Sequence, residues 1–272
     1  LNEKQHPAMF RMSGSLKQIK AVLIDLSGTL HVGNNIIPGA QNAVNKLRKS
    51  RLKIKFVTNT TKESHQSLHD RLNRLGFEVK KDEIFTSLSS ARTLIDKMKL
   101  RPHLMLSESA KRDFFGVETE NPNAVVMGLS PDHFSYEEMN KAMKLLQNGA
   151  KLIAINKARY FQRENDIALG TGAFVAALEY ATDVKSIVVG KPEKSFFHGA
   201  IESLGCRSEE CVMIGDDVRD DVGGAIESGM SGLLVKTGKY RSGDEEKINL
   251  ALEFVVNDVL SAVDLILASI EL

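Results

Sequence analysis

The side chains best suited to chemistry stand where predicted strands end. Asp25 ends the apolar run "AVLID", and Thr58 and Asn59 end the run "LKIKFVTN". Lys191 follows "SIVVG", and Asp216 ends "CVMIGD". Because ligands bind at the carboxyl ends of strands in open parallel sheets, we expect these side chains to converge on one crevice.

This set contains the parts that phosphoryl transfer requires. Asp25 offers a carboxylate that can attack phosphorus. Asp25 and the acidic segment "GDDVRDD" (215–221) offer hard oxygen ligands for Mg²⁺, which neutralises the phosphate and the developing charge. Lys191 adds a point charge, while Thr58 and backbone N–H groups bind phosphate oxygens. No other segment of the sequence offers a competing set.

Each segment also has a purely structural interpretation. Asp25 can cap the turn that follows it, and Lys191 can be a surface side chain ahead of a helix predicted to start near Glu193. The acidic loop resembles a Ca²⁺ site but lacks the EF-hand spacing and the bidentate Glu. The segment "GTGAFVAALEY" (170–180) lacks the third glycine of a dinucleotide fingerprint. The four segments taken together favour catalysis.

Strand-like runs alternate with helix-like periodicity along the chain. The predicted strands are 21–25, 52–59, 124–128, 151–156, 186–190, 211–216, 231–238 and 254–258. Segments such as 39–50, 64–76 and 135–149 have apolar residues three and four apart and Gly near their ends, which predicts helices. This alternation is typical of an α/β protein with mostly parallel strands.

The composition indicates a globular protein with a substantial core. The chain has 272 residues, of which 42% are hydrophobic, so two domains are expected. Lys and Arg number 36 against 35 Asp and Glu, and no basic stripe is interleaved with aromatic residues. This balance argues against nucleic acid as a partner.

The sequence suggests neither a zinc site nor a membrane span. Cys206 and Cys211 lack nearby paired histidines, so reduced thiols in a cytoplasmic protein are expected. No stretch approaches the ~20 apolar residues of a membrane helix, and no membrane partner is predicted. Residues 1–17 are polar and aperiodic, without the apolar segment of a secretory signal, and are predicted to be a flexible tail.

Four motifs in order resemble those of the haloacid dehalogenase superfamily of aspartyl-nucleophile phosphatases. They are "DLSGTL" (25–30), "VTNTT" (57–61), "GKPEKSFF" (190–197) and "GDDVRDD" (215–221). The resemblance covers the chain from about residue 18 to its end. It implies a Rossmann-like parallel-sheet core (18–88 and 188–272) with an inserted α/β cap domain (89–187).

The resemblance also assigns roles around the phosphate. Asp25 is the implied nucleophile, and an aspartyl-phosphate intermediate is expected. Thr58 and the backbone at Asn59 are implied to bind the transferring phosphoryl group. Lys191 is implied to hold phosphate and Asp25 in register. Arg159, Tyr160 and Arg163 in the predicted cap are candidates for contacting the distal part of a substrate, although an exposed cap face explains each equally well.

The implied metal is Mg²⁺, and its implied ligands are Asp25, the backbone carbonyl of Ser27, Asp216 and Asp221. Asp221 is assigned by spacing, either through water or as a brace. Four aspartates in six residues cannot all reach one ion, and repulsion favours spreading them. We therefore expect Asp217 and Asp220 to be solvated loop charges.

Ser27 departs from the family pattern. In most phosphatases of this family, the residue two after the nucleophile is an aspartate that protonates the leaving group. A serine hydroxyl cannot replace it at neutral pH, and general acid–base catalysis is typically worth ~10² to 10⁴ in rate. Ser27 is therefore grouped with the substrate-binding residues, and a slow phosphatase that prefers good leaving groups is predicted.

Two alternatives to a slow phosphatase stay open. The site can bind a phosphate ligand or phosphoprotein with little turnover. A mutase-like phosphoryl carrier is weaker, because nothing in the sequence indicates a second acceptor site. The substrates expected are a small-molecule phosphate, pyrophosphate or a phosphoprotein. The resemblance also implies a homodimer, because relatives with this cap often pair through it.

Overall fold

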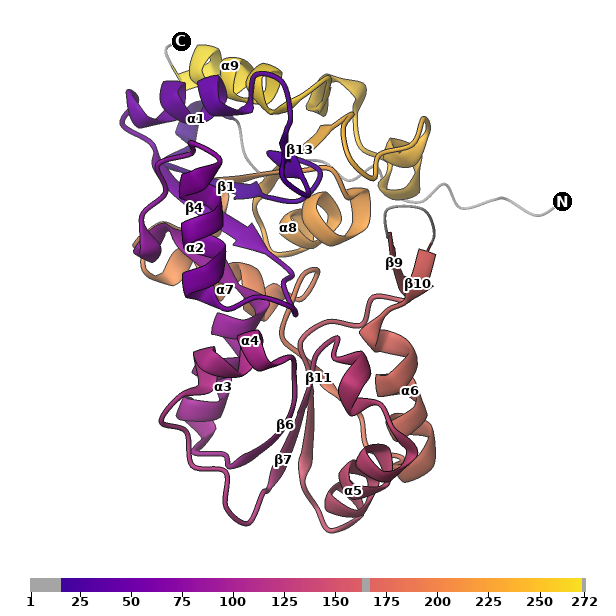
Figure 1. The fold of residues 1–272 in the computed structure, drawn as a ribbon. Helices are drawn as coiled ribbons and strands as arrows, with labels where there is room; N and C mark the ends of the chain where they lie inside the picture. The colour runs from indigo at the N-terminus through magenta and orange to yellow at the C-terminus, as the bar shows by residue number, and fades with distance from the viewer. Residues whose placement is uncertain (1–15, 163–166, 271–272) are drawn as a thin grey trace, which may run out of the picture. The chain divides into compact units, whose positions relative to one another are not determined.

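The computed structural model describes residues 16–162 and 167–270 (Figure 1). The chain divides into two compact units. The first combines residues 1–57 with 200–272, and the second spans residues 58–199. Residues 1–15 of the predicted tail lie outside the described residues, while Leu16–Gln18 form a 3₁₀ turn in which Leu16 is buried.

The first unit contains a parallel sheet. Its strands are β1 (Ala21–Asp25), β4 (Lys53–Thr58), β12 (Cys211–Gly215), β13 (Ser231–Val235) and β14 (Val255–Val256), in the order β14-β13-β12-β1-β4. Every neighbouring pair in this series is parallel. All residues of β1, β12 and β13 are buried, which explains their nearly continuous apolar sequences.

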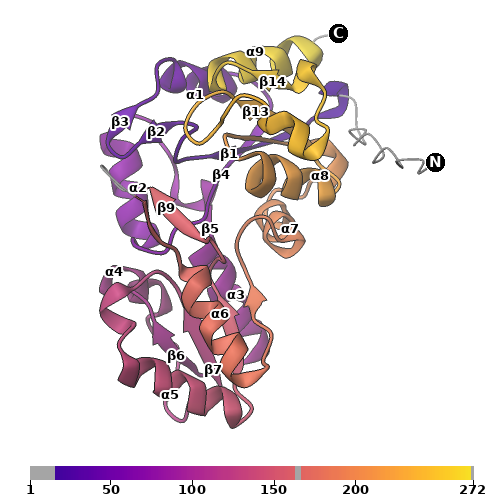
Figure 2. The same cartoon turned by 90° about the vertical axis from the view of Figure 1, so that its right-hand side faces the viewer.

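Helices complete the first unit. They are α1 (Ala40–Arg48), α8 (Gly224–Glu227), α9 (Val259–Ile270) and the end of α7 (Lys194–Glu202). Helices α1 and α9 lie side by side (Figures 1 and 2). Helix α1 buries Ala40, Ala43, Val44 and Leu47, whose spacing of three and four residues forms one apolar face.

Shorter elements connect these parts of the first unit. The strands β2 (His31–Val32) and β3 (Asn35–Ile36) form a small antiparallel ribbon after β1. A π-helical turn covers Val218–Gly223, and 3₁₀ turns cover Ser208–Glu210, Asp244–Ile248 and Leu252–Phe254.

The second unit has its own parallel sheet. Its strands are β6 (Pro102–Met105), β7 (Ala124–Met127), β8 (Lys151–Ala154) and β11 (Ile187–Val188), in the order β11-β8-β7-β6. All three pairings are parallel. The unit also contains β5 (Ile84–Thr86) and an antiparallel pair, β9 (Tyr160–Gln162) and β10 (Ile167–Leu169).

Helices pack on both faces of this second sheet. They are α3 (Ser87–Met98), α4 (Glu108–Lys111), α5 (Tyr136–Gln147) and α6 (Thr171–Thr182). Val126 and Ile153 pack in one core with Leu88 and Ile95 of α3. Their strand neighbours Val125, Leu152 and Ala154 belong to a second core with α5 and α6. Alternate strand residues therefore enter opposite cores.

The remaining elements of the second unit are α2 (His65–Arg74), the beginning of α7, and 3₁₀ turns over Lys81–Glu83, Arg112–Phe114 and Pro131–His133. Helix α2 begins where the sequence predicts, because the Ser64 hydroxyl accepts a hydrogen bond from the Ser67 N–H. Ser135 caps α5 in the same way through the Glu138 N–H.

The predicted alternation of strands and helices is confirmed, with differences in detail. Each of the eight predicted strand runs contains an observed strand. Among the described residues, strands β2, β3, β5, β6, β9 and β10 were not predicted. Five of them have only two or three residues, and the longer β6 begins with Pro102 and His103. Pro cannot donate a ladder hydrogen bond and is tolerated at the first residue of a strand.

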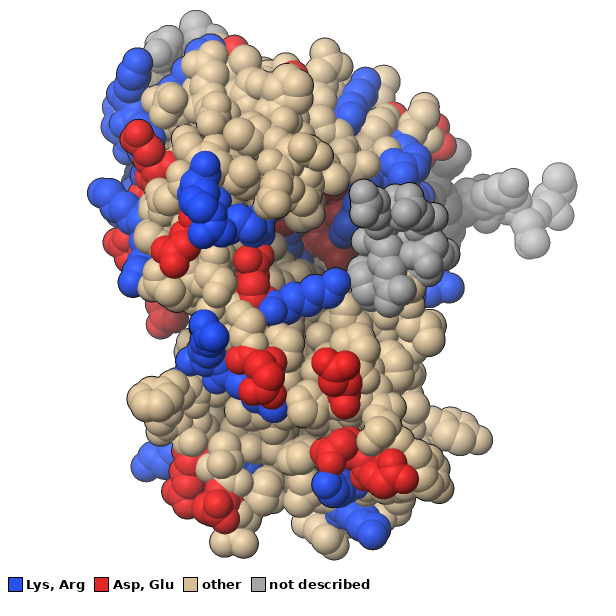
Figure 3. Space-filling model, in the orientation of Figure 1, with Lys and Arg blue, Asp and Glu red and all other residues tan. Residues whose placement is uncertain are grey.

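The face in Figure 3 intersperses Lys and Arg with Asp and Glu, in line with the nearly equal numbers of the two charges. Among the described residues, no helix combines the length and the apolar character that crossing a membrane requires.

Candidate active site

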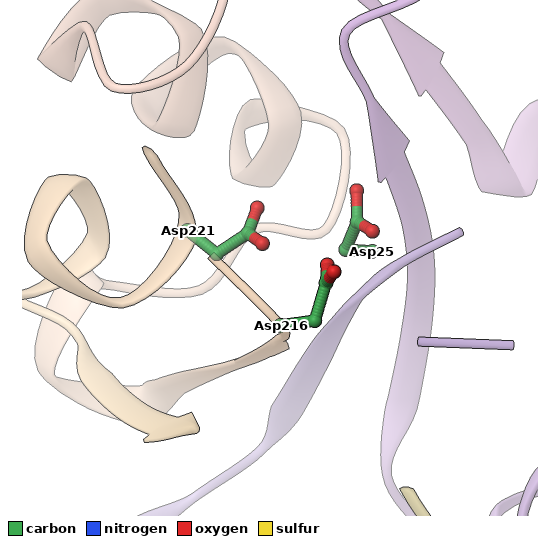
Figure 4. A group of neighbouring side chains, drawn as sticks. All are labelled: Asp25, Asp216 and Asp221. Carbon is green, nitrogen blue, oxygen red and sulfur yellow. The ribbon is translucent and has the colours of Figure 1, made fainter. Parts of the chain in front are cut away.

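Three buried carboxylates gather in the first unit. Asp25, Asp216 and Asp221 each offer a carboxylate oxygen, and these oxygens all lie within 4.8 Å of one another (Figure 4). The exposed fractions of the three residues are 5%, 1% and 1%. Because like charges this close repel one another, the cluster favours a bound cation. The structure thus brings together the three aspartates that were predicted as metal ligands.

Adjacent parallel strands position two of these aspartates. Asp25 is the last residue of β1, and Asp216 directly follows β12. The strands pair in register, with Ile24 opposite Ile214. Each aspartate therefore emerges at the carboxyl end of its strand, which is where ligands bind in such sheets.

Asp221 reaches the cluster through the π-helical turn. Its side chain accepts a hydrogen bond from the Asp217 N–H at 3.1 Å. The Asp217 side chain in turn accepts hydrogen bonds from the N–H groups of Arg219 and Asp220, both at 3.0 Å. Asp217 thus caps this turn, and the expectation that it is a solvated loop charge is wrong, because its side chain is only 24% exposed.

The turn after Asp25 needs a residue without a side chain. Gly28 has φ +98°, and a Cβ atom at this position would overlap the carboxylate of Asp216. Its N–H donates to the carbonyl of His31 at 2.8 Å. Ser27 is exposed, whereas Asp25 and Leu26 are buried. The glycine of "DLSGTL" therefore allows the close approach of Asp216.

Lys239, for which the sequence predicted no role, also lies beside the carboxylate cluster. The Lys239 backbone N–H donates to Asp216 Oδ2 at 2.6 Å, and its ammonium lies 3.1 Å from Asp217 Oδ2. Burial alone would raise the pKa of Asp217, but Lys239 and the N–H groups of the turn lower it. A signal did exist in the sequence: Lys239 follows β13, which neighbours β12 in the sheet.

All three carboxylates of the cluster, together with Asp217, affect the pKa of Lys239. Burial alone would lower the pKa of its ammonium, but the nearby carboxylates raise it well above its usual range. The carboxylates responsible are those of Asp217, Asp221, Asp216 and Asp25. The net shift shows that negative charge dominates around this ammonium.

Of the predicted substrate-binding residues, Thr58, Asn59 and Lys191 belong to the second unit and Ser27 to the first. Thr58 is also the last residue of β4. Two hydrogen bonds in opposite directions join Asn59 and Lys191. The Lys191 N–H donates to Asn59 Oδ1 at 2.8 Å, and Asn59 Nδ2 donates to the Lys191 carbonyl at 2.9 Å. Thr58 and Lys191 are buried, with exposed fractions of 8% and 5%. The structure therefore joins the second and third motifs within this unit.

The predicted substrate contacts of the cap are only partly described. Tyr160 begins β9 and is 61% exposed, and Arg159 directly before it is also exposed. Arg163 lies outside the described residues. The exposure of Arg159 and Tyr160 is compatible with either of their two interpretations.

Two families match the chain. One, described as haloacid dehalogenase-like hydrolase, matches residues 22–118, and the other, described as HAD-hydrolase-like, matches residues 188–262. The haloacid dehalogenase-like hydrolase domain-containing protein 2 of Bos taurus is 56% identical over 251 residues, which cover 92% of this chain and 97% of that protein.

The chain belongs to the haloacid dehalogenase-like hydrolases. The phospholysine phosphohistidine inorganic pyrophosphate phosphatase of Homo sapiens is 38% identical over 258 residues, covering 93% of this chain and 96% of that protein. The resemblance to the haloacid dehalogenase superfamily and the prediction of a hydrolase of this type are confirmed.

Solved structures of haloacid dehalogenase-like enzymes support the fold. The 4-nitrophenylphosphatase of Thermotoga maritima has a TM-score of 0.84 and 25% identity, covering 92% of this chain and 98% of that one. The p-nitrophenyl phosphatase of Archaeoglobus fulgidus has the same TM-score and 27% identity, covering 91% and 99%. The predicted fold class, a parallel-sheet α/β protein of the haloacid dehalogenase type, is confirmed.

Proposed function

We propose that this hydrolase is a Mg²⁺-dependent phosphatase with Asp25 as its nucleophile. The observation that carries the proposal is the cluster of buried carboxylates at the ends of β1 and β12. Phosphatases among the relatives and among the similar solved structures support the same reaction class.

The residues of the cluster suit Mg²⁺. They offer carboxylate oxygens, which are the hard ligands that this ion prefers, and Cys and His are absent from the four motifs. Asp25, Asp216 and Asp221 would hold the ion, together with the backbone carbonyl of Ser27. When bound, Mg²⁺ neutralises phosphate charge and the charge that develops during transfer.

The chain's own residues account for the remaining steps of the proposed reaction. A carboxylate oxygen of Asp25 attacks phosphorus, the bond to the leaving group breaks, and water later hydrolyses the aspartyl phosphate. The roles proposed for Thr58, Asn59 and Lys191 are to bind the phosphoryl oxygens. The hydrogen bonds between Asn59 and Lys191 support these roles, because they hold the Lys191 backbone in place.

Ser27 sets the proposed substrate preference. Its hydroxyl cannot protonate a leaving group as a carboxylic acid does, so good leaving groups are favoured. Aryl phosphates, acyl phosphates, pyrophosphate and phosphoramidates meet this requirement. The names of the relatives that act on phosphohistidine, phospholysine and pyrophosphate support this choice of substrates. The alternative is binding of a phosphate ligand or phosphoprotein with little turnover.

The proposal extends to the organisation of the chain. The core is assigned to residues 18–88 and 188–272 and the cap to residues 89–187, and the sheet of β6, β7, β8 and β11 supports a separate cap. A homodimer and a cytoplasmic location stay predictions.

Removal of the metal tests the proposal. Purified protein should hydrolyse 4-nitrophenyl phosphate and pyrophosphate with Mg²⁺, lose this activity in excess EDTA, and regain it when Mg²⁺ is restored. Release of inorganic phosphate is the measurement, and a Ca²⁺ addition is the matched control, because Ca²⁺ favours larger and more flexible coordination. Activity that survives thorough chelation would exclude Mg²⁺ from the reaction. Phosphate binding without any turnover would favour the alternative.

A further inference from the structure

The loop after β13 packs directly onto the acidic cluster. The Thr237 hydroxyl donates to the Gly28 carbonyl at 2.5 Å, and the Lys239 N–H donates to Asp216 Oδ2 at 2.6 Å. Gly238 between them has φ +54°, and a Cβ atom there would overlap the Asp216 carboxylate. The loop backbone is therefore attached both to the turn after Asp25 and to Asp216 itself.

The Lys239 ammonium balances the charge of this region. It lies 3.1 Å from Asp217 Oδ2, and the Asp217 N–H holds Asp221 at 3.1 Å. The side chain is 67% exposed, so the ammonium also contacts solvent. Burial alone would lower the pKa of this ammonium, but Asp217 beside it raises it, and the cluster carboxylates of Asp221, Asp216 and Asp25 add to this effect.

We propose that Lys239 is a built-in counter-ion of the carboxylate cluster and that its charge weakens the binding of Mg²⁺. The inference rests on the proposed metal site. The ammonium and the dication are like charges in the field of the same aspartates, so each lowers the affinity of the cluster for the other. In the metal-free protein, the ammonium offsets part of the repulsion among the carboxylates.

The charge of Lys239 can be removed without removing its positioning contact. The hydrogen bond to Asp216 comes from the backbone N–H, which every residue except Pro retains. Lys239→Met keeps an unbranched apolar stem and deletes only the ammonium. Lys239→Arg keeps the charge. Lys236→Met deletes an exposed charge on the same loop and serves as the matched control.

Calorimetric titration with MgCl₂ in phosphate-free buffer tests the inference without any turnover. Lys239→Met should bind Mg²⁺ on the order of three- to tenfold more tightly than wild type. Lys239→Arg and Lys236→Met should stay close to wild type. The gain should shrink between about 20 mM and about 500 mM KCl, because salt screens exposed charges. Urea unfolding of each variant checks that the fold is retained, and Lys239→Gln is a second neutral variant.

The possible outcomes separate the two proposals. If wild-type protein binds no Mg²⁺, the metal site itself is wrong, and the role of Lys239 is lost with it. If wild type binds Mg²⁺ and the neutral variants bind it equally or more weakly, the counter-ion role is overturned while the metal site stands. Tighter binding by both neutral variants, and by neither control, supports the inference.

Discussion

The two units stabilise largely buried carboxylates in different ways. The first unit contains the cluster of Asp25, Asp216 and Asp221, and the second contains Glu179. The three aspartates lie against one another, with oxygens within 4.8 Å. Glu179 accepts hydrogen bonds from Lys157 Nζ at 2.8 Å and from the Ser186 N–H and hydroxyl at 2.9 and 2.7 Å. Its side chain is 15% exposed.

The difference separates a carboxylate that supports the fold from the carboxylates for which we propose a catalytic and metal-binding role. Protein donors stabilise Glu179 as a charged group, so its charge contributes to the free energy of unfolding. In the cluster, Asp216 and Asp221 also accept backbone N–H hydrogen bonds, but the three carboxylates repel one another, so a bound cation would add to the stability of the folded protein. Substitutions in the cluster should therefore change mainly kcat/KM, whereas substitution of Glu179 should change mainly the free energy of unfolding.

The largest effect is expected for Asp25→Asn. The amide keeps the size of the side chain but cannot act as the nucleophile, so kcat/KM for 4-nitrophenyl phosphate should fall by at least about 10³-fold. The urea midpoint of the metal-free protein should stay equal or rise, because one negative charge leaves the cluster. Glu179→Gln is the control that should keep its activity. An active Asp25→Asn variant would remove Asp25 from the mechanism.

A smaller effect is expected when a fourth carboxylate is added by Ser27→Asp. The new acid can protonate poor leaving groups, so the ratio of kcat/KM for an alkyl phosphate to that for an aryl phosphate should rise about 10- to 100-fold. The ratio, measured at saturating Mg²⁺, is insensitive to changes in the metal site that affect both substrates. Ser27→Asn is the uncharged control. An unchanged ratio in the folded variant would show that Ser27 does not limit the choice of leaving group.

The smallest effect is expected for the stability of Glu179→Gln. The pKa of Glu179 is lowered from 4.5 to about 2, because hydrogen bonds from Lys157 and Ser186 outweigh the opposing effect of burial. A lowered folded-state pKa means that the stabilisation is present above pH 4.5 and is lost as the pH falls toward 2. The variant should lose about 1–2 kcal/mol of unfolding free energy at pH 7.

Urea unfolding at several pH values measures this last effect. The difference between wild type and Glu179→Gln should narrow steadily below pH 4.5. Glu253→Gln, at an exposed glutamate of the first unit, is the control. A difference that does not depend on pH would show that the shape of Glu179, rather than its charge, stabilises the second unit.

Much of the site was predictable because it follows strand ends. Asp25 and Asp216 come after apolar runs that pair in register, which a periodicity argument can anticipate. The assignments within "GDDVRDD" depend on local winding. The spacing of the family motif indicated Asp221, but the capping role of Asp217 depends on a π-helical turn that the spacing does not reveal. Lys239 also follows a predicted strand, 231–238, but a single lysine among 36 Lys and Arg residues does not by itself indicate a role.

The two segments of the first unit also impose an order on its assembly during synthesis. Strand β1 lies between β4, which is nearby in the chain, and β12, which follows about 140 residues of the second unit. At ~5–20 residues per second, the ribosome needs about 7–30 s to bridge this interval. The continuous second unit can therefore complete its sheet first, while β1 still presents an apolar edge to chaperones. Asp216 joins Asp25 only afterwards, so a nascent chain acquires its carboxylate cluster among its last features.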